Sequence, residues 1–167
     1  MVIRAERESD KAAIYKVNEL AFGTTAEADL VDALREQAEP IISLVAEDGG
    51  EVVGHIMFSP VSLSTDSELK VAGLAPMAVA PAHQRQGVGS ALVRAGIERC
   101  REMGFRAVVV LGHREYYPRF GFLPASRFGL QCEYDVPDDV FMAMELHPKA
   151  LDMKSGVVKY HAVFSNL

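Results

Sequence analysis

The segment VAPAHQRQGVGSAL, residues 79–92, passes from an apolar strand pattern into an apolar helix pattern. The turn between the two contains Gly87 and Gly89, although glycine is entropically unfavourable in a helix. Glycines at this point either only shape the turn or let a ligand approach the backbone. The first N–H groups of a helix have no intrahelical acceptor and favour negative charge. The segment therefore predicts a strand, a turn and a helix that together can bind a phosphate.

The turn fits one of three phosphate-binding patterns. A P-loop requires G-x-x-x-x-G-K-[ST], which does not occur in the sequence. A dinucleotide fingerprint requires a third glycine or alanine where Leu92 stands, and it opens directly from a strand. The third pattern is Q/R-x-x-G-x-G/A after a strand that ends in V-x-P. Val79, Pro81 and Gln84 complete this pattern together with the two glycines.

Outward from this turn, hydrophobic periodicity predicts an alternation of strands and helices. Expected strands cover residues 2–6, 41–47, 51–63, 70–80, 105–112, 140–146 and 156–164. Expected helices cover 9–22 and 87–103. Between them, a further helix is expected to start after Thr24 or Thr25 and to stop before Pro40. Residues 113–120 form at most a short helix, broken near Pro118. Ser9 is the expected N-cap of the first helix, and Gly104 is the expected C-terminal cap after residue 103.

The order of these elements predicts an α+β fold with a mixed central sheet flanked by helices. The hairpin signal DGG joins 41–47 to 51–63, and the strand–helix–strand unit 71–111 predicts a parallel strand pair. Pro76 predicts an irregularity in its strand, because proline cannot donate to a ladder. A chain of 167 residues suits a single domain.

Composition narrows the class of protein. The formal net charge is −6 and no basic stripe occurs, so we expect no nucleic-acid partner. No apolar run reaches 18 residues and the N-terminus has no signal core, so we expect a cytoplasmic protein without a membrane association. Cys100 and Cys132 make no disulfide framework. The five histidines lack zinc-ligand spacing, so we expect no metal.

The glycine turn resembles the coenzyme A site of the GNAT superfamily of N-acetyltransferases. A second match lies in YYPRFGF, residues 116–122, which resembles the family's Y-x-x-x-G-F through Tyr117, Gly121 and Phe122. The resemblance covers about residues 2–146 and implies that the sheet is splayed. The stretches GHIMFSPV and YYPRFGFLPA look like a stand-alone bacterial branch of small predicted acetyltransferases. Members of that branch continue through a final strand, so residues 147–167 are expected to be a C-terminal strand extension of the same domain.

The resemblance implies a cofactor site for acetyl-CoA. Backbone amides of the turn would hold its pyrophosphate, and the strand before the turn would pair with the pantetheine arm. The implied cofactor-binding residues are Met77, Ala78, Val79, Gln84, Arg85, Gln86, Gly87, Val88, Gly89, Ser90 and Tyr117. Arg85 or Arg94 could add a cation, although a solvated surface role suits Arg94 better.

The resemblance also assigns a catalytic role. Tyr117 would be the general acid that protonates the leaving thiolate, and the neighbouring Tyr116 is expected to be structural. No carboxylate occurs in VAGLAPMAV, where some family members have a glutamate. His113 and Glu115 are the nearest candidates for a base, and loss of the proton through ordered water is equally open. His55, on an apolar strand, is expected to be a satisfied core residue.

We therefore expect an acetyl-CoA-dependent N-acetyltransferase that moves the acetyl group directly to a primary amine of a small molecule or peptide. Alternatives are an acyl-CoA-binding sensor without turnover and a transferase for a longer acyl group. The acceptor would lie between the first two helices, the strand around His55 and the chain after residue 123. Acidic residues there could attract a cation, namely Glu27, Asp29, Glu133 and Asp135. The chain could be a monomer or a homodimer.

Overall fold

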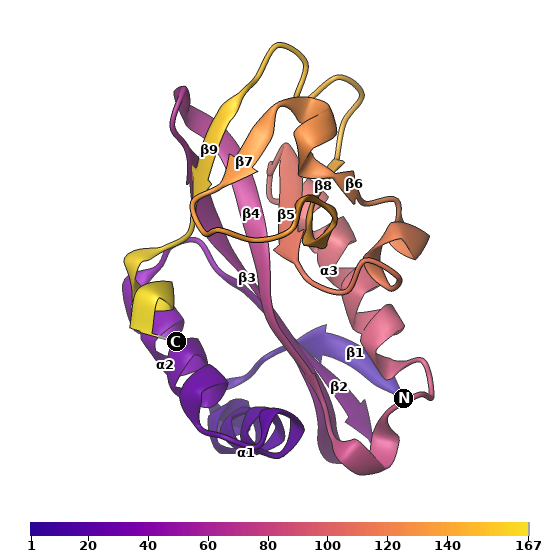
Figure 1. The fold of residues 1–167 in the computed structure, drawn as a ribbon. Helices are drawn as coiled ribbons and strands as arrows, with labels where there is room; N and C mark the ends of the chain where they lie inside the picture. Colours follow the sequence, from indigo (N-terminus) through magenta and orange to yellow (C-terminus); the bar gives the residue numbers. More distant parts are fainter. Residues whose placement is uncertain (167) are drawn as a thin grey trace.

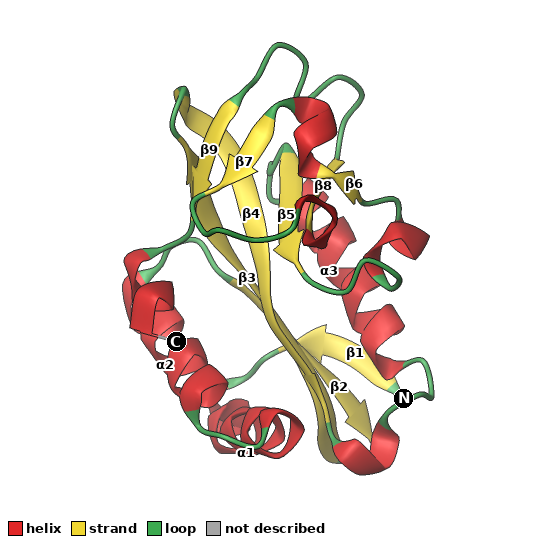
Figure 2. Cartoon of the chain, in the orientation of Figure 1, coloured by secondary structure: helices red, strands yellow, loops and turns green. Residues whose placement is uncertain are grey.

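The computed structural model describes residues 1–166, whose strands form one mixed sheet (Figures 1 and 2). The strands are β1 (Val2–Ala5), β2 (Ile42–Asp48), β3 (Glu51–Leu63), β4 (Asp66–Val79), β5 (Ala107–Leu111), β6 (Leu123–Pro124), β7 (Leu130–Cys132), β8 (Phe141–Glu145) and β9 (Gly156–Lys159). Their order across the sheet is β1-β2-β3-β4-β5-β8-β6, and β9 pairs with both β3 and β7. The architecture is the mixed α+β fold that the sequence predicts.

Three α-helices cover the two faces of the sheet (Figure 2). They are α1 (Lys11–Phe22), α2 (Ala26–Gln37) and α3 (Val88–Glu102). Buried side chains of α1 and α2 share one apolar cluster with β5 and β9, and those of α3 form a second cluster with β2 and β3. Short 3-10 helices complete the fold: η1 (Glu8–Asp10), η2 (Pro81–His83), η3 (Tyr117–Phe120), η4 (Ala125–Phe128), η5 (Asp138–Val140) and η6 (Ala162–Asn166).

The central strands follow the predicted pattern. β2, β3 and β4 form an antiparallel meander, and the β2–β3 hairpin turns through Gly49 and Gly50, both of which have positive φ. β4 and β5 are parallel, with Val71–Gly73 facing Ala107–Val109. Gly104 adopts the expected left-handed conformation after α3, with a φ of 87°.

Three local expectations are wrong. Ser9 is not the N-cap of α1: the 3-10 helix η1 precedes it, and the Asp10 carboxylate accepts the Arg7 N–H at 2.6 Å. Pro118 does not break a helix but lies in the first turn of η3, where a missing N–H is tolerated. The last expected strand stops at Lys159, and the chain then turns through η6.

Pro76 causes the irregularity that the sequence predicts in β4. Ile56 of β3 faces Met77 and Phe58 faces Leu74, so two residues of β4 oppose one residue of β3. Such a bulge bends a strand and increases its twist. The β4–β5 ladder ends at Gly73. Beyond Gly73, no residue in the described part of β5 pairs with β4. The edge of β4 that faces β5 is therefore free of backbone partners from there on.

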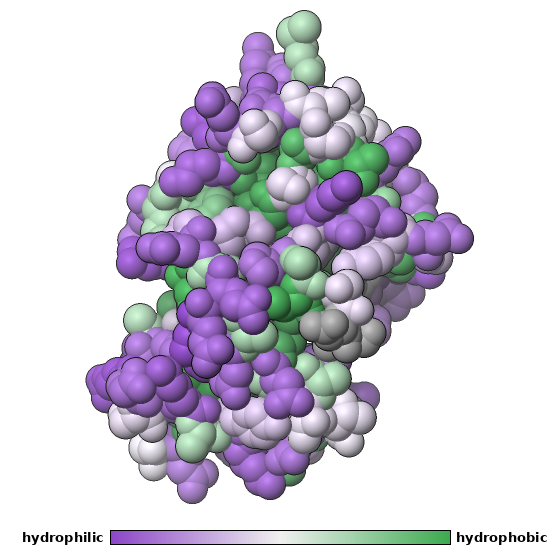
Figure 3. All heavy atoms as spheres, turned by 90° about the vertical axis from the view of Figure 1, so that its left-hand side faces the viewer, coloured by the Kyte–Doolittle hydropathy of each residue, from purple (hydrophilic) through white to green (hydrophobic). Residues whose placement is uncertain are grey.

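A helix that spans a membrane must meet requirements in length and hydropathy. None of the helices in residues 1–166 is long and apolar enough to cross a bilayer. Figure 3 shows the left-hand side of Figure 1, where hydrophilic residues dominate and apolar atoms show between them in the middle of the view.

Candidate active site

A cleft of about 700 Å³ opens where the end of β4 meets the start of α3. It is lined by Ala21, Phe22, Met77, Ala78, Val79, His83, Gln84, Arg85, Gly87, Val88, Gly89, Ser90, His113, Tyr116, Tyr117 and Arg119. The walls therefore come from the C-terminal end of α1, the free end of β4, the turn before α3 and the segment that leads into η3. This cleft brings together most of the residues that the sequence singles out.

The turn before α3 has the backbone geometry of an anion site. Gly87 precedes the helix with a φ of 85°, and Arg85 also has a positive φ, of 62°. No side chain of residues 1–166 caps the N-terminus of α3. The N–H groups of Val88, Gly89 and Ser90 therefore lack intrahelical acceptors and lie beside the cleft. Uncapped donors at the positive end of a helix dipole favour a bound anion.

The side chains of the two glutamines brace this turn. Gln84 donates from Nε2 to the carbonyl oxygen of Val79 at 3.0 Å, which ties the turn to the end of β4. Gln86 donates from Nε2 to the carbonyl oxygen of Ala82 at 3.4 Å. Gln86 is exposed and does not line the cleft. Among the predicted cofactor residues it is the one that lies outside the cleft wall.

The absence of a side chain at Gly89 leaves room for a close approach between α3 and the residue before η3. A Cβ added to Gly89 would lie 3.0 Å from the Tyr116 hydroxyl oxygen and 3.4 Å from Cε of Met77. The Tyr116 hydroxyl also lies 3.3 Å from Oγ of Ser90. Tyr116, expected to be structural, is therefore part of the cleft and contacts the turn directly.

Tyr117 is held rigidly at the cleft wall. It is 7% exposed, and its ring packs edge-on against Tyr116 and Phe122 at centroid distances of 5.1 and 5.7 Å. A Cβ on Gly112 would lie 2.3 Å from the ring, so this close contact requires glycine. Burial raises the pKa of Tyr117 to about 12. The phenol is therefore protonated throughout the neutral range, and its raised pKa also makes it a weaker acid than an exposed tyrosine.

The two candidate bases, His113 and Glu115, differ in whether they line the cleft. His113 is exposed and lines the cleft. Glu115 is also exposed, but it lines only a neighbouring depression, which it shares with His113, Arg114 and Val140. The structure thus brings His113 toward Tyr117 and leaves Glu115 outside.

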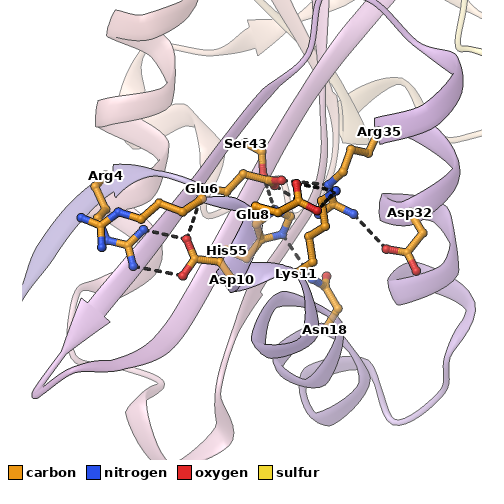
Figure 4. Close-up of polar contacts among 11 residues, drawn as sticks. Arg4, Glu6, Glu8, Asp10, Lys11, Asn18, Asp32, Arg35, Ser43 and His55 are labelled. Carbon is orange, nitrogen blue, oxygen red and sulfur yellow. Dashed lines mark hydrogen bonds and ion pairs between the residues drawn. The ribbon is translucent and has the colours of Figure 1, made fainter.

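His55 lies in a buried polar network rather than in the cleft (Figure 4). It is 0% exposed; Asn18 Nδ2 lies 3.2 Å from its Nδ1, and Ser43 Oγ lies 2.9 Å from its Nε2. Ser43 donates to Glu6, which also accepts two hydrogen bonds from Arg35 at 2.8 and 3.1 Å. Because Ser43 donates to Glu6, its oxygen accepts the Nε2 proton of His55. This network joins β2 and β3 to α1 and α2.

The environment of the network keeps His55 neutral. Burial lowers the pKa of His55 to about 3, and the nearby Glu6 only partly opposes this effect. Burial also raises the pKa of Glu6, but the hydrogen bonds from Arg35 and Ser43 outweigh it and leave that pKa below its usual value. His55 is therefore a satisfied core histidine, as the apolar strand around it predicts.

The cleft is basic although the chain is acidic. Arg85 and Arg119 line it, and no carboxylate is found among its described lining residues. The guanidinium of Arg119 also stacks over the Tyr116 ring, 4.6 Å from the ring centroid. Arg94, in contrast, stacks over Phe120 and does not line the cleft. These charges favour a ligand that carries several negative charges.

Sequence reasoning missed several lining residues. Arg119 lies within the YYPRFGF stretch and His83 lies within the turn, so both were adjacent to recognised positions. Ala21 and Phe22 reach the cleft from α1, more than fifty residues away in the chain, and no local pattern indicates such a contact. Phe22 is 42% exposed and the neighbouring Leu20 is 49% exposed, and the sequence alone does not distinguish the one that lines the cleft.

Comparisons with known proteins agree on one family. The model described as "Acetyltransferase (GNAT) domain" matches residues 2–125. The chain is 37% identical over 166 residues to the uncharacterised N-acetyltransferase YhbS of Escherichia coli K12, covering 99% of both chains. It is also 43% identical over 136 residues to the uncharacterised N-acetyltransferase YjhQ of the same strain, covering 79% of this chain and 75% of YjhQ.

Two solved structures share the fold throughout. The crystal structure of Escherichia coli YhbS in complex with CoA superimposes with a TM-score of 0.92 at 36% identity, covering 98% of this chain and 91% of that one. A GNAT family acetyltransferase from Brucella melitensis in complex with acetyl-CoA gives a TM-score of 0.80 at 39% identity, covering 98% and 97%.

Proposed function

Because this chain belongs to the GNAT acetyltransferase family, we propose that it transfers an acetyl group from acetyl-CoA directly to a primary amine of a small molecule or peptide. The observation that carries the proposal is the uncapped N-terminus of α3 beside the free edge of β4. Both features lie in one cleft, which is basic and large enough for an extended ligand. The CoA and acetyl-CoA complexes of the two similar structures support the same cosubstrate.

Backbone amides between Gln84 and Ser90 hold the pyrophosphate in this proposal. The donors of the first helical turn offer several hydrogen bonds without burying a charged side chain. Arg85 and Arg119, which both line the cleft, add positive charge. This part of the site resembles a nest of N–H groups, which binds anions by geometry and dipole together.

The free edge of β4 receives the pantetheine arm. Met77, Ala78 and Val79 pair with β3 on one side only, so their other side is open for strand-like hydrogen bonds. A backbone N–H on this edge polarises the thioester carbonyl and stabilises the negative charge that develops on its oxygen.

Tyr117 acts as the general acid. The amine nitrogen attacks the thioester carbon, a C–N bond forms, and the C–S bond breaks. Tyr117 then protonates the thiolate, whose conjugate acid has a pKa near 8.5 by analogy with cysteine. Because the pKa of Tyr117 is about 12, this transfer is uphill and requires direct contact with the sulfur as the C–S bond breaks. His113 is the candidate that relays the proton lost from the amine, because it lines the same cleft. Glu115, outside that cleft, acts at most through water.

The first test is calorimetric titration of acetyl-CoA, with NAD as a control. We expect micromolar binding, about −8 kcal/mol, and no binding of NAD. Gly89→Ala adds only a Cβ against the movable Tyr116 hydroxyl and should weaken binding modestly. Gly89→Glu adds a negative charge at the same point and should abolish it. Absence of binding by the unchanged protein would refute the proposal.

A second measurement separates the alternatives. A sensor would bind acetyl-CoA as tightly but release no free thiol when amines are added, whereas a transferase would release one thiol per acetylated amine. A transferase for a longer acyl group would release the thiol faster from a longer acyl-CoA than from acetyl-CoA at equal concentration.

A further inference from the structure

A second cleft, of about 300 Å³, lies against β4, the strand that also lines the first cleft, and against the end of β5. It is lined by Leu74, Ala75, Leu111, Tyr134, Tyr160 and Phe164. None of these six side chains carries a charge. Leu74 and Ala75 belong to β4, Leu111 ends β5, and Tyr160 and Phe164 come from the C-terminal segment. The first cleft uses none of these residues.

The second cleft lies where β4 and β5 separate. Gly73 and Val109 form the last pair of their ladder. The cleft residues of each strand follow just beyond it, namely Leu74 and Ala75 in β4 and Leu111 in β5. Met77, which lines the first cleft, is only two residues beyond Ala75. Two residues of a strand span roughly 7 Å. A thioester held on the free edge of β4 is therefore within reach of a molecule in the second cleft.

The hydroxyl of Tyr160 has no partner. It is buried and finds no hydrogen-bonding atom among residues 1–166, although the ring lines the second cleft. The oxygen is out of contact with solvent, so a ligand in the cleft reaches it only if the side chain turns. A hydrogen bond made there would remove the free-energy cost of the unpaired group. Burial raises the pKa of this phenol well above its usual value, which keeps it as a neutral donor.

Three aromatic rings form the outer wall. Tyr134 and Tyr160 are 6.3 Å apart between centroids, and Tyr160 packs edge-on against Phe164 at 5.2 Å. The Glu133 carboxylate accepts the backbone N–H of Tyr160 at 2.6 Å and so fixes the position of that residue beside Tyr134. Glu133 is thus engaged in positioning and does not line the cleft.

We propose that this second cleft binds the acceptor, and that the acceptor is an uncharged primary amine carried on an aromatic ring. The inference rests on the proposed acetyl transfer and adds to it the class of substrate. With no carboxylate in the cleft, an ammonium group would lose its hydration and gain only contacts with aromatic faces. An amine attached directly to an aromatic ring is neutral near pH 7, so it can attack without a base. Aromatic rings fit edge-on or offset against Tyr134 and Phe164, and the Tyr160 hydroxyl bonds to the acceptor.

The chemical balance needs no further reactant. The aryl nitrogen forms the C–N bond, the C–S bond breaks, and one proton moves in net from nitrogen to sulfur. This route explains how the chain can function although its β4 strand carries no acidic residue near the cleft.

The test compares three probes: aniline, cyclohexylamine and spermidine. Aniline and cyclohexylamine have rings of the same size, but only cyclohexylamine is an ammonium ion near pH 7. We expect kcat/KM for aniline to exceed that for either other amine at pH 7 by at least about tenfold, and to change little with pH. A preference for cyclohexylamine or spermidine at pH 7 would overturn the inference, whereas binding of acetyl-CoA in the same preparation would leave the proposed function intact.

Variants locate the effect in the second cleft. Tyr134→Ala removes a ring that is already 36% exposed, and Leu123→Ala is its control, because Leu123 is 41% exposed and lines neither cleft. Tyr134→Ala should raise the KM for aniline about fivefold or more, a loss of the size of one aromatic contact, and leave the KM for acetyl-CoA unchanged. Leu123→Ala should change neither.

Tyr160→Phe tests the unpaired hydroxyl without altering the fold. It removes a group that has no partner in the chain, so thermal unfolding should be unchanged or shifted upward. The KM for aniline should rise about fivefold, as expected for one lost hydrogen bond. An unchanged KM for aniline in both Tyr134→Ala and Tyr160→Phe would place the acceptor elsewhere and refute the inference.

Discussion

Tyr116 and Tyr117 are neighbours in the chain but meet different surroundings. The Tyr116 hydroxyl touches Ser90 and the position of a Gly89 side chain, so it supports the turn. The ring of Tyr117 is buried between Gly112 and Phe122, and its pKa is raised to about 12. Tyr116 therefore supports the turn, whereas Tyr117 offers a fixed phenol that stays protonated near neutral pH.

This difference predicts that removing the hydroxyl from each tyrosine in turn affects kcat very differently. Tyr117→Phe should lower kcat about 100-fold, the size of a typical general-acid contribution, and leave the dissociation constant of acetyl-CoA within about twofold, because the ring and its packing are retained. Tyr116→Phe should leave kcat nearly unchanged. Single-turnover rates and calorimetry separate the two effects. Equal rates in both variants would remove Tyr117 from the mechanism.

The polar network around His55 fixes the positions of α1 and α2 against the sheet. His55 and Asn18 join β3 to α1, while Glu6 and Arg35 join the end of β1 to α2 (Figure 4). α1 in turn carries Phe22 to the rim of the first cleft. The network thus positions part of the candidate site although its own residues do not line the cleft.

The lowered pKa of His55 makes the stability of this arrangement depend on pH. The unfolded histidine takes up a proton below pH 6.5, but the buried one does so only near pH 3. Stability therefore falls by about 1.4 kcal/mol per pH unit as the pH drops below 6.5. Urea unfolding at pH 7.5, 6.0 and 5.0 measures this slope. His55→Gln lacks the titrating group and should lose less stability over the same interval.

Glu6 is the control for this interpretation. Its pKa is lowered in the folded state, so its own contribution is lost only as the pH falls below the usual range for a glutamate. The interval between pH 6.5 and 5 is therefore dominated by His55 within this network. Parallel slopes for the unchanged protein and His55→Gln in that interval would show that the network is not the source of acid sensitivity.

At the scale of the whole molecule, the sequence predicted most of what periodicity and turn chemistry control. The meander, the parallel pair and α3 follow from continuous apolar patterns, and Gly104 and Pro76 marked a helix end and a bulge. β6 and β7 were missed because they have only two and three residues, too short for a periodic pattern.

The candidate site was predictable where its residues are contiguous. The turn from Gln84 to Ser90 and the stretch around Tyr117 are local patterns, and both reach the first cleft. The second cleft joins β4, β5 and the C-terminal segment, and Phe164 approaches Leu74 only through the fold. A single sequence contains no signal for contacts of this kind, since they depend on the tertiary packing of distant segments.

The C-terminal segment provides the last prediction, because the sequence suggested a core of residues 2–146 with an appended strand. In the structure β9 pairs with Ser62 and Leu63 of β3 and with β7. Four buried side chains of this segment belong to the apolar cluster that α1 and α2 share with β5 and β9. They are Val158 of β9, Tyr160 just after it, and Val163 and Phe164 of η6. Burial of each contributes about 1.5–3 kcal/mol. Their sum is comparable with the entire stability of a typical domain, about 5–15 kcal/mol.

A chain that ends at Ser155 should therefore lose its cooperative urea transition, followed by far-ultraviolet circular dichroism. A chain that ends at Phe164 keeps all four buried side chains and should unfold like the full protein, which makes it the matched control. If the shorter chain unfolds cooperatively at the same urea concentration as the control, residues 156–164 are an accessory strand and the core is complete without them. If it does not, the segment that completes the second cleft is also required for folding, and the acceptor site and the fold depend on the same residues.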